Sequence, residues 1–158
     1  MFVAARGVIY AAGFVVLWAW LAVSIRPYDS LLPFLIPTWL RPVGLVLSIA
    51  GAFVAVWCIA TFVTKGRGTP APFDPPIQFV AVGPYRYLRN PMYLGALCVI
   101  AGAGLALTSP AIVLLALLFG LVAHLFVLVY EEPALERRFG SNYLNYKTSV
   151  PRWLPRMP

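Results

Sequence analysis

The sequence predicts an all-α integral membrane protein with four transmembrane helices and a cytoplasmic amphipathic C-terminal helix. Of its 158 residues, 61% are hydrophobic and 11% are charged, whereas a soluble domain carries about 25% charged residues. Long stretches lack Asp, Glu, Lys and Arg altogether, and a membrane span needs roughly 20 apolar residues. These stretches are 7–25, 42–64 and 92–130.

The four predicted spans are 7–25, 42–64, 92–108 and 110–130. The last two come from one stretch that is long enough for two helices, with its natural break at Thr108-Ser109-Pro110. The first span resembles a cleaved signal peptide only loosely, at Ala22-Val23-Ser24. Since the rest of the chain is membrane-embedded, we interpret it as a span, and residues 1–158 as one membrane domain.

Small residues recur at helical spacing on the second and third predicted spans. A stripe of this kind lets another helix approach closely, so we interpret both stripes as packing surfaces. They comprise Gly44, Ser48, Gly51 and Ala55 on the second span, and Gly95, Gly102 and Ala106 on the third.

The basic residues predict the orientation in the membrane. With an even number of spans, only Arg26 and Arg41 fall on the far side, and every other Lys and Arg shares the side of the two termini. The positive-inside rule then places both termini in the cytoplasm. The compact chain leads us to expect a prokaryotic inner membrane. Topology and anionic lipid headgroups account for the net charge of +7, so it indicates no nucleic-acid partner.

The cytoplasmic segments are predicted to be a loop, 65–91, and a tail, 131–158. The loop is rich in proline and cannot be a regular helix through most of its length. In the tail, four apolar and aromatic residues fall on one helical face, which predicts an amphipathic helix in the membrane interface. They are Leu135, Phe139, Tyr143 and Tyr146.

Metal chemistry is not expected. The chain has one His and two Cys, and these do not have the spacing of a metal or redox motif. We interpret Cys58 and Cys98 as packing residues. His124 is interpreted as a hydrogen-bonding partner of a neighbouring helix, with a position in a cavity wall as the alternative.

Three of the five carboxylates lie within six residues, as Glu131, Glu132 and Glu136. The first two stand where the fourth predicted span ends, although a carboxylate is unfavourable at a helix C-terminus and costly near hydrocarbon unless it is paired. Two interpretations remain open. The pair caps the following helix, with Pro133 in its first turn, or it holds a cation.

A second polar motif precedes the third predicted span. Asn90 suits the N-cap of this helix and Pro91 its first turn, which is a structural explanation for both. The same helix start also offers free N–H groups to an anion, and Arg86 and Arg89 flank it. Three tyrosines add aromatic faces, unless they and the arginines are interface anchors. They are Tyr85, Tyr87 and Tyr93.

The two motifs are expected to meet, because the third and fourth spans form a hairpin whose cytoplasmic ends are neighbours. One end supplies anion-binding donors and the other supplies carboxylates. A zwitterionic ligand with an additional positive centre and an aromatic base would suit such a site.

In this order and spacing, the residues resemble the isoprenylcysteine carboxyl methyltransferase family, and integral-membrane phospholipid methyltransferases are similar in the same region. The resemblance covers roughly residues 65–155, and the first 60 residues match only in being membrane spans. Its motifs are Gly83-Pro84-Tyr85, Arg89, Pro91, Tyr93, Gly95, Glu131-Glu132, Leu135, Phe139-Gly140, Tyr143, Tyr146 and Val150-Pro151-Arg152. Members of the family often have His where this chain has Asn90, which cannot carry charge.

The resemblance implies S-adenosylmethionine as methyl donor, S-adenosylhomocysteine as product, and a lipophilic acceptor such as an isoprenylcysteine-like carboxylate. We expect Glu131 or Glu132 to bind the donor's ammonium group, and Arg138 or Arg152 to bind an acceptor carboxylate. The predicted cofactor-binding residues are Tyr85, Arg86, Arg89, Asn90, Pro91, Tyr93, Glu131 and Glu132. The predicted catalytic residues are Arg138, Arg152 and Glu132.

Two other classes of function remain as alternatives. One is a membrane sterol or lipid reductase that uses NADPH, although the sequence has no βαβ unit with a G-x-G-x-x-G motif. The other is a non-enzymatic membrane scaffold or a small transporter, although no span carries a central charged residue. Methyl transfer needs positioning and exclusion of water rather than a metal, which suits this composition.

Overall fold

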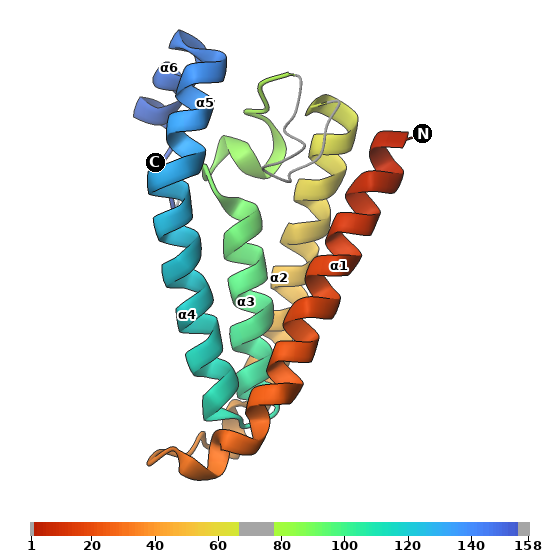
Figure 1. Ribbon diagram of the computed structural model, residues 1–158, viewed down its shortest axis with the longest axis vertical. Coiled ribbons are helices and arrows are strands. Elements are labelled where there is room, and N and C mark those ends of the chain that lie inside the picture. The colour runs from red at the N-terminus through yellow and green to blue at the C-terminus, as the bar shows by residue number, and fades with distance from the viewer. Residues whose placement is uncertain (1, 67–77, 155–158) are drawn as a thin grey trace.

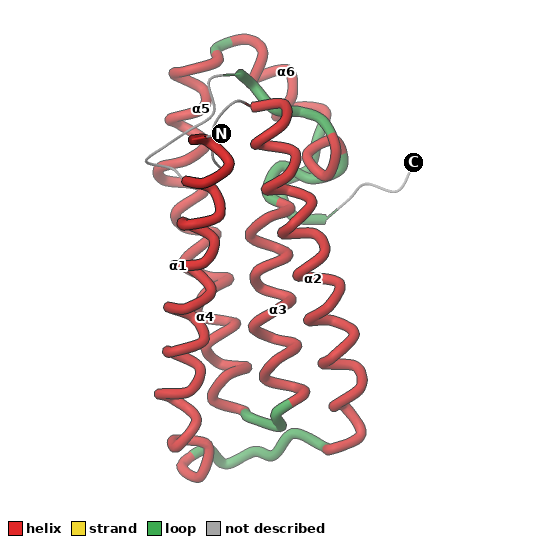
Figure 2. The backbone as a smooth tube through the Cα atoms, turned by 90° about the vertical axis from the view of Figure 1, so that its right-hand side faces the viewer, coloured by secondary structure: helices red, strands yellow, loops and turns green. Residues whose placement is uncertain are grey.

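The computed structural model describes residues 2–66 and 78–154. Most of the proline-rich part of the predicted loop lies outside these residues. Every regular element of the described residues is a helix, which confirms the all-α class (Figures 1 and 2).

Four long helices run alongside one another (Figure 1). They are α1 (Phe2–Ile25), α2 (Arg41–Thr61), α3 (Pro91–Ala106) and α4 (Pro110–Phe126). A π-helical turn extends α2 (η3, Phe62–Gly66) and another extends α4 (η5, Val127–Glu131). The short helices are η1 (Arg26–Leu31), η2 (Thr38–Leu40), η4 (Gly83–Arg86), α5 (Glu132–Phe139) and α6 (Ser141–Ser149).

Three helical stretches of the described residues are long and apolar enough to cross a membrane: Ala5–Leu31, Thr38–Gly66 and Pro110–Phe139. Helix α3 is equally apolar in character but has only 16 residues. Large apolar side chains point outward from these helices, and Val15, Ile49 and Leu117 are each more than half exposed. An outer surface of this kind is suited to lipid rather than to water.

Helices α2 and α3 pack backbone to backbone through the two predicted stripes of small residues, which confirms their packing role. A Cβ atom at Gly51 would lie 2.5 Å from the carbonyl oxygen of Gly95, and one at Gly44 would lie 2.5 Å from that of Gly102. The Ser48 hydroxyl donates to the Val99 carbonyl at 3.3 Å. This close contact fixes the start of α3, which borders the polar end of the molecule.

Asp29 stabilises the far end of the bundle by capping the N-terminus of α4, which lies far from it in the sequence. Its Oδ1 accepts hydrogen bonds from the Ser109 hydroxyl and the Ala111 amide, each at 2.8 Å. Ser109 is fully buried and its hydroxyl oxygen accepts from the Ile112 amide at 3.3 Å. The chain therefore turns from α3 into α4 at the predicted break, where Thr108 takes a left-handed conformation with φ of 51°.

Substituting alanine for Asp29 is expected to lower the free energy of unfolding by about 1–3 kcal/mol, because two buried donors lose an acceptor. The matched control is Ser30→Ala, since the exposed Ser30 hydroxyl bonds only locally to the Pro27 carbonyl. Thermal unfolding in detergent would compare the two variants. Equal stability of both with the wild type would rule out the cap as a stabilising contact.

The tail differs from its prediction as one amphipathic helix, because it forms two helices. Gly140 separates α5 from α6 with φ of 52° and ψ of −129°, a conformation that side chains disfavour and glycine tolerates. Because the chain turns here, α6 folds back toward the start of α3. Residues 150–154, called the C-terminal strap below, then follow α6.

Candidate functional site

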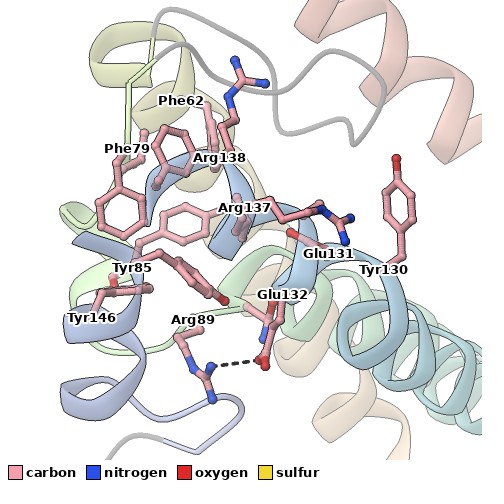
Figure 3. A pocket seen from close by; sticks show the side chains of 16 residues that line it. Phe62, Phe79, Tyr85, Arg89, Tyr130, Glu131, Glu132, Arg137, Arg138 and Tyr146 are labelled. Carbon is pink, nitrogen blue, oxygen red and sulfur yellow. Dashed lines mark hydrogen bonds and ion pairs between the residues drawn. The ribbon is translucent and has the colours of Figure 1, made fainter. Parts of the chain in front are cut away.

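A cavity of about 430 Å³ lies where α3 begins and α4 ends (Figure 3). Its walls come from η3, residues 79–90, the η5–α5 segment and α6. Its volume is in the range of small-molecule sites, about 300–1,000 Å³. The predicted loop and the predicted tail therefore meet around one hollow, together with the end of the second predicted span.

Aromatic rings gather on one side of the cavity (Figure 3). Phe62 and Tyr85 meet edge to face with their centroids 5.0 Å apart, and Phe79 lies 5.1 Å from Tyr146. Burial raises the pKa of Tyr85 well above its usual range and that of Tyr143 to about 12. Both phenols therefore stay neutral at physiological pH, and the wall is suited to a flat ring or a cationic centre.

Glu131 lines the cavity, and its side chain is hydrogen-bonded by a residue of α3. Its Oε2 accepts a hydrogen bond of 2.8 Å from the Tyr93 hydroxyl. Within the residues described here, Glu131 forms no ion pair. The cavity therefore contains a carboxylate with a neutral hydrogen-bond donor on one oxygen.

Glu132 lies in a different setting, at the centre of a cluster of cations. It is only 4% exposed, and its carboxylate lies 2.9 Å from Arg89 Nη1 and 3.6 Å from Lys147 Nζ. Arg152 donates to both of its oxygens, at 2.7 and 3.0 Å. Hydrogen bonding to Glu132 raises the pKa of Arg152. Glu132 therefore connects the loop before α3, α6 and the C-terminal strap.

The C-terminal strap crosses the outside of the cavity wall. The Arg89 amide donates to the Pro151 carbonyl at 2.9 Å, and Asn90 Nδ2 donates to the Arg152 carbonyl at 3.3 Å. Trp153 Nε1 donates to Nδ1 of His124 at 3.0 Å. His124 thus bonds the strap rather than the neighbouring helix that was predicted, and it does not line the cavity.

Six of the predicted site residues line the cavity: Tyr85, Arg89, Asn90, Glu131, Glu132 and Arg138. Arg86 is exposed outside it, and Pro91 is buried in the first turn of α3. Tyr93 and Arg152 reach it only through Glu131 and Glu132.

Two structural interpretations require correction. Asn90 stands at the N-cap position of α3, but its side chain makes no capping hydrogen bond and binds the strap instead. The Glu131 side chain likewise makes no cap for α5. Pro133 does occupy the first turn of that helix, as predicted.

Sequence reasoning did not assign several cavity residues to the site. Phe62, Phe79, Tyr130 and Arg137 all line it, and neither Phe62 nor Phe79 belongs to a motif. The four residues of the predicted amphipathic face also line it. Their stripe is visible in the sequence, but the pattern alone predicts a face in the membrane interface, whereas the structure turns it toward the cavity. Among the described residues, no group of three His, Cys, Asp or Glu could hold a metal ion.

Comparison with known proteins identifies the family to which the chain belongs. The phospholipid methyltransferase family profile matches residues 39–142, from η2 into α6. This chain belongs to the phospholipid methyltransferase family. Protein-S-isoprenylcysteine O-methyltransferase A from Arabidopsis thaliana is 30% identical to it over 124 residues, which are 74% of this chain and 60% of that protein.

Membership of the phospholipid methyltransferase family confirms the resemblance found in the sequence. Together with the three long apolar helices, it identifies the chain as an integral membrane protein. The matched region contains η4, the start of α3 and the Glu131-Glu132 pair, so most of the cavity lies within it. The chain spans 60% of the length of the curated relative that it matches.

Proposed function

We propose that this chain is a membrane methyltransferase that uses S-adenosylmethionine and acts on a lipophilic acceptor. One observation carries the proposal: the cavity combines an aromatic wall with a carboxylate, Glu131, that no described cation neutralises. Membership of the family supports it independently.

The residues of the cavity fit the donor's groups. The ring wall around Tyr85 suits an adenine base and a sulfonium, which aromatic faces attract. Glu131 suits the ammonium group through a charge-assisted hydrogen bond. Arg89 lines the same cavity and suits the carboxylate. When bound, S-adenosylmethionine supplies a methyl group on a positively charged sulfur.

For the reaction, the residues of this chain need only position two partners and exclude water. The long helices present apolar side chains on their outer faces, and we expect a lipophilic acceptor to approach the cavity from that side. We assign an acceptor carboxylate to Arg138, whose guanidinium lies over the Phe139 ring at 5.7 Å from its centroid. Arg152 pairs with Glu132 and, unlike Arg89, does not line the cavity, so a role for it in acceptor binding stays a prediction.

The assignment of a carboxylate rests on the two arginines of the cavity edge, Arg137 and Arg138. A positive edge attracts an anionic acceptor and repels a protonated amine. The plant relative is named an isoprenylcysteine O-methyltransferase, and this acceptor class agrees with the choice. Transfer of labelled methyl groups to phosphatidylethanolamine, with none to a prenylated cysteine, would contradict the assignment.

We also propose four membrane spans with both termini in the cytoplasm, and we retain the prediction of a prokaryotic inner membrane. Helix α3 packs between α2 and α4, so it shares their membrane environment despite its shorter length (Figure 1). The N-terminus lies at the same end of the bundle as α5 and α6 (Figure 1). This is the end that carries Arg86, Arg137 and Arg138, as the positive-inside rule requires of a cytoplasmic face.

Exchanging Glu131 for glutamine is expected to weaken binding of S-adenosylhomocysteine by about tenfold or more, because a charge-assisted hydrogen bond is lost. Calorimetry with the detergent-purified protein measures the dissociation constant. The matched control is Glu136→Gln, since Glu136 pairs with Lys147 and does not line the cavity. Unchanged affinity in folded Glu131→Gln protein would remove Glu131 from the donor site.

A further inference from the structure

Two adjacent glutamates of the cavity have opposite surroundings. Glu132 is surrounded by Arg89, Arg152 and Lys147. Glu131 has no ion pair within the described part of the chain, and its one hydrogen bond to a described side chain comes from Tyr93. Of these two carboxylates, Glu131 is therefore the one that no described cation already pairs with.

Tyr93 reaches this carboxylate from outside the cavity. It is the third residue of α3, a helix whose start is fixed by Pro91 and by the close packing of Gly95 on Gly51. Its side chain is partly buried and does not line the cavity. The Tyr93 hydroxyl is thus placed by a rigid helix and meets Oε2 of Glu131 at 2.8 Å.

A hydrogen bond to one carboxylate oxygen restricts the rotation of the whole group. Glu131 lies at the end of a π-helical turn, on a side chain that otherwise samples several rotamers. With Oε2 held by Tyr93, Oε1 remains for a donor inside the cavity. Ordering a side chain before binding removes an entropic cost from the binding step.

We propose that Tyr93 is a positioning residue that holds the Glu131 carboxylate toward the ammonium group of the bound amino-acid ligand. The inference rests on the proposed function. It assigns to Tyr93 a role exerted through Glu131, without contact between the tyrosine and the ligand. Because the hydroxyl is neutral, it orients the carboxylate without pairing it with a competing cation.

The test compares two ligands in each variant: S-adenosylhomocysteine and its analogue that lacks the amino group. Their ratio of dissociation constants reports recognition of the ammonium group and cancels a general loss of folding. The wild type is expected to prefer S-adenosylhomocysteine by about tenfold or more, and Glu131→Gln is expected to lose this preference. Tyr93→Phe is expected to reduce the preference by about threefold or more, with the affinity for the analogue nearly unchanged.

The matched control is Tyr87→Phe, because Tyr87 lies shortly before α3, is 58% exposed and does not line the cavity. It is expected to keep the full preference. A full preference in Tyr93→Phe, or an equal loss of affinity for both ligands, would overturn the positioning role alone. Binding of neither ligand by the folded wild type would overturn the proposed function, and the positioning role with it.

Discussion

Glu132→Ala is expected to destabilise the protein by about 3–5 kcal/mol, the usual effect of removing one partner of a buried ion pair. Glu132 is 4% exposed and faces Arg89, Arg152 and Lys147. Removing it leaves a buried guanidinium at Arg89 whose Nε has no hydrogen-bond partner in the described residues. The loop before α3, α6 and the C-terminal strap then lose their common contact, so binding of S-adenosylhomocysteine is expected to disappear as well.

The matched control for this prediction is Glu136→Ala. Glu136 also pairs with Lys147, but both side chains are about one-third exposed, and an exposed ion pair contributes about 0–1 kcal/mol. Denaturation in detergent gives the free energy of unfolding of each variant. A Glu132→Ala protein within about 1 kcal/mol of wild type, with its ligand affinity intact, would refute the central role of Glu132.

Gly51→Ala is expected to cost about 1–3 kcal/mol or more, because the new methyl group meets backbone rather than a movable side chain. It would lie 2.5 Å from the Gly95 carbonyl oxygen and 2.9 Å from the Val99 amide nitrogen. Helices α2 and α3 must therefore separate. Since the start of α3 fixes Asn90 in the cavity wall and Tyr93 against Glu131, the affinity for S-adenosylhomocysteine is expected to fall with the stability.

Gly13→Ala is the control for this second prediction, because an added Cβ at Gly13 has no neighbouring atom within 4 Å. Alanine in place of an interior helical glycine is expected to leave the stability unchanged or raise it by up to about 1 kcal/mol. Equal stability of the Gly13→Ala and Gly51→Ala proteins would show that α2 and α3 do not pack as described.

Much of the fold was predictable because apolar stretches and small-residue stripes are local signals. Each of the four long helices coincides over most of its length with an uncharged run, and the break before α4 follows from Pro110. The division of the tail at Gly140 was not predicted, since the stripe from Leu135 to Tyr146 continues across it at helical spacing. The cap provided by Asp29 was equally hidden, because its partners lie some 80 residues away along the chain.

The candidate site was predictable where its chemistry lies in motifs. Glu131, Arg89 and Tyr85 stand in short polar runs at the ends of predicted spans, and all three line the cavity. Phe62 and Phe79 belong to no such motif. An aromatic residue beside a membrane span is common in any membrane protein, so its presence does not indicate a site. The different settings of Glu131 and Glu132 depend on side-chain directions that their adjacent positions in the sequence do not reveal.

The most direct test of the proposed function is isothermal calorimetry of the detergent-purified protein with S-adenosylhomocysteine, with NADPH as the competing ligand class. A cavity with an aromatic wall and a carboxylate in a member of this family is expected to give saturable binding of S-adenosylhomocysteine and none of NADPH. Binding of NADPH alone would assign the protein to the reductases, and binding of neither ligand by folded protein would contradict a methyl-donor site.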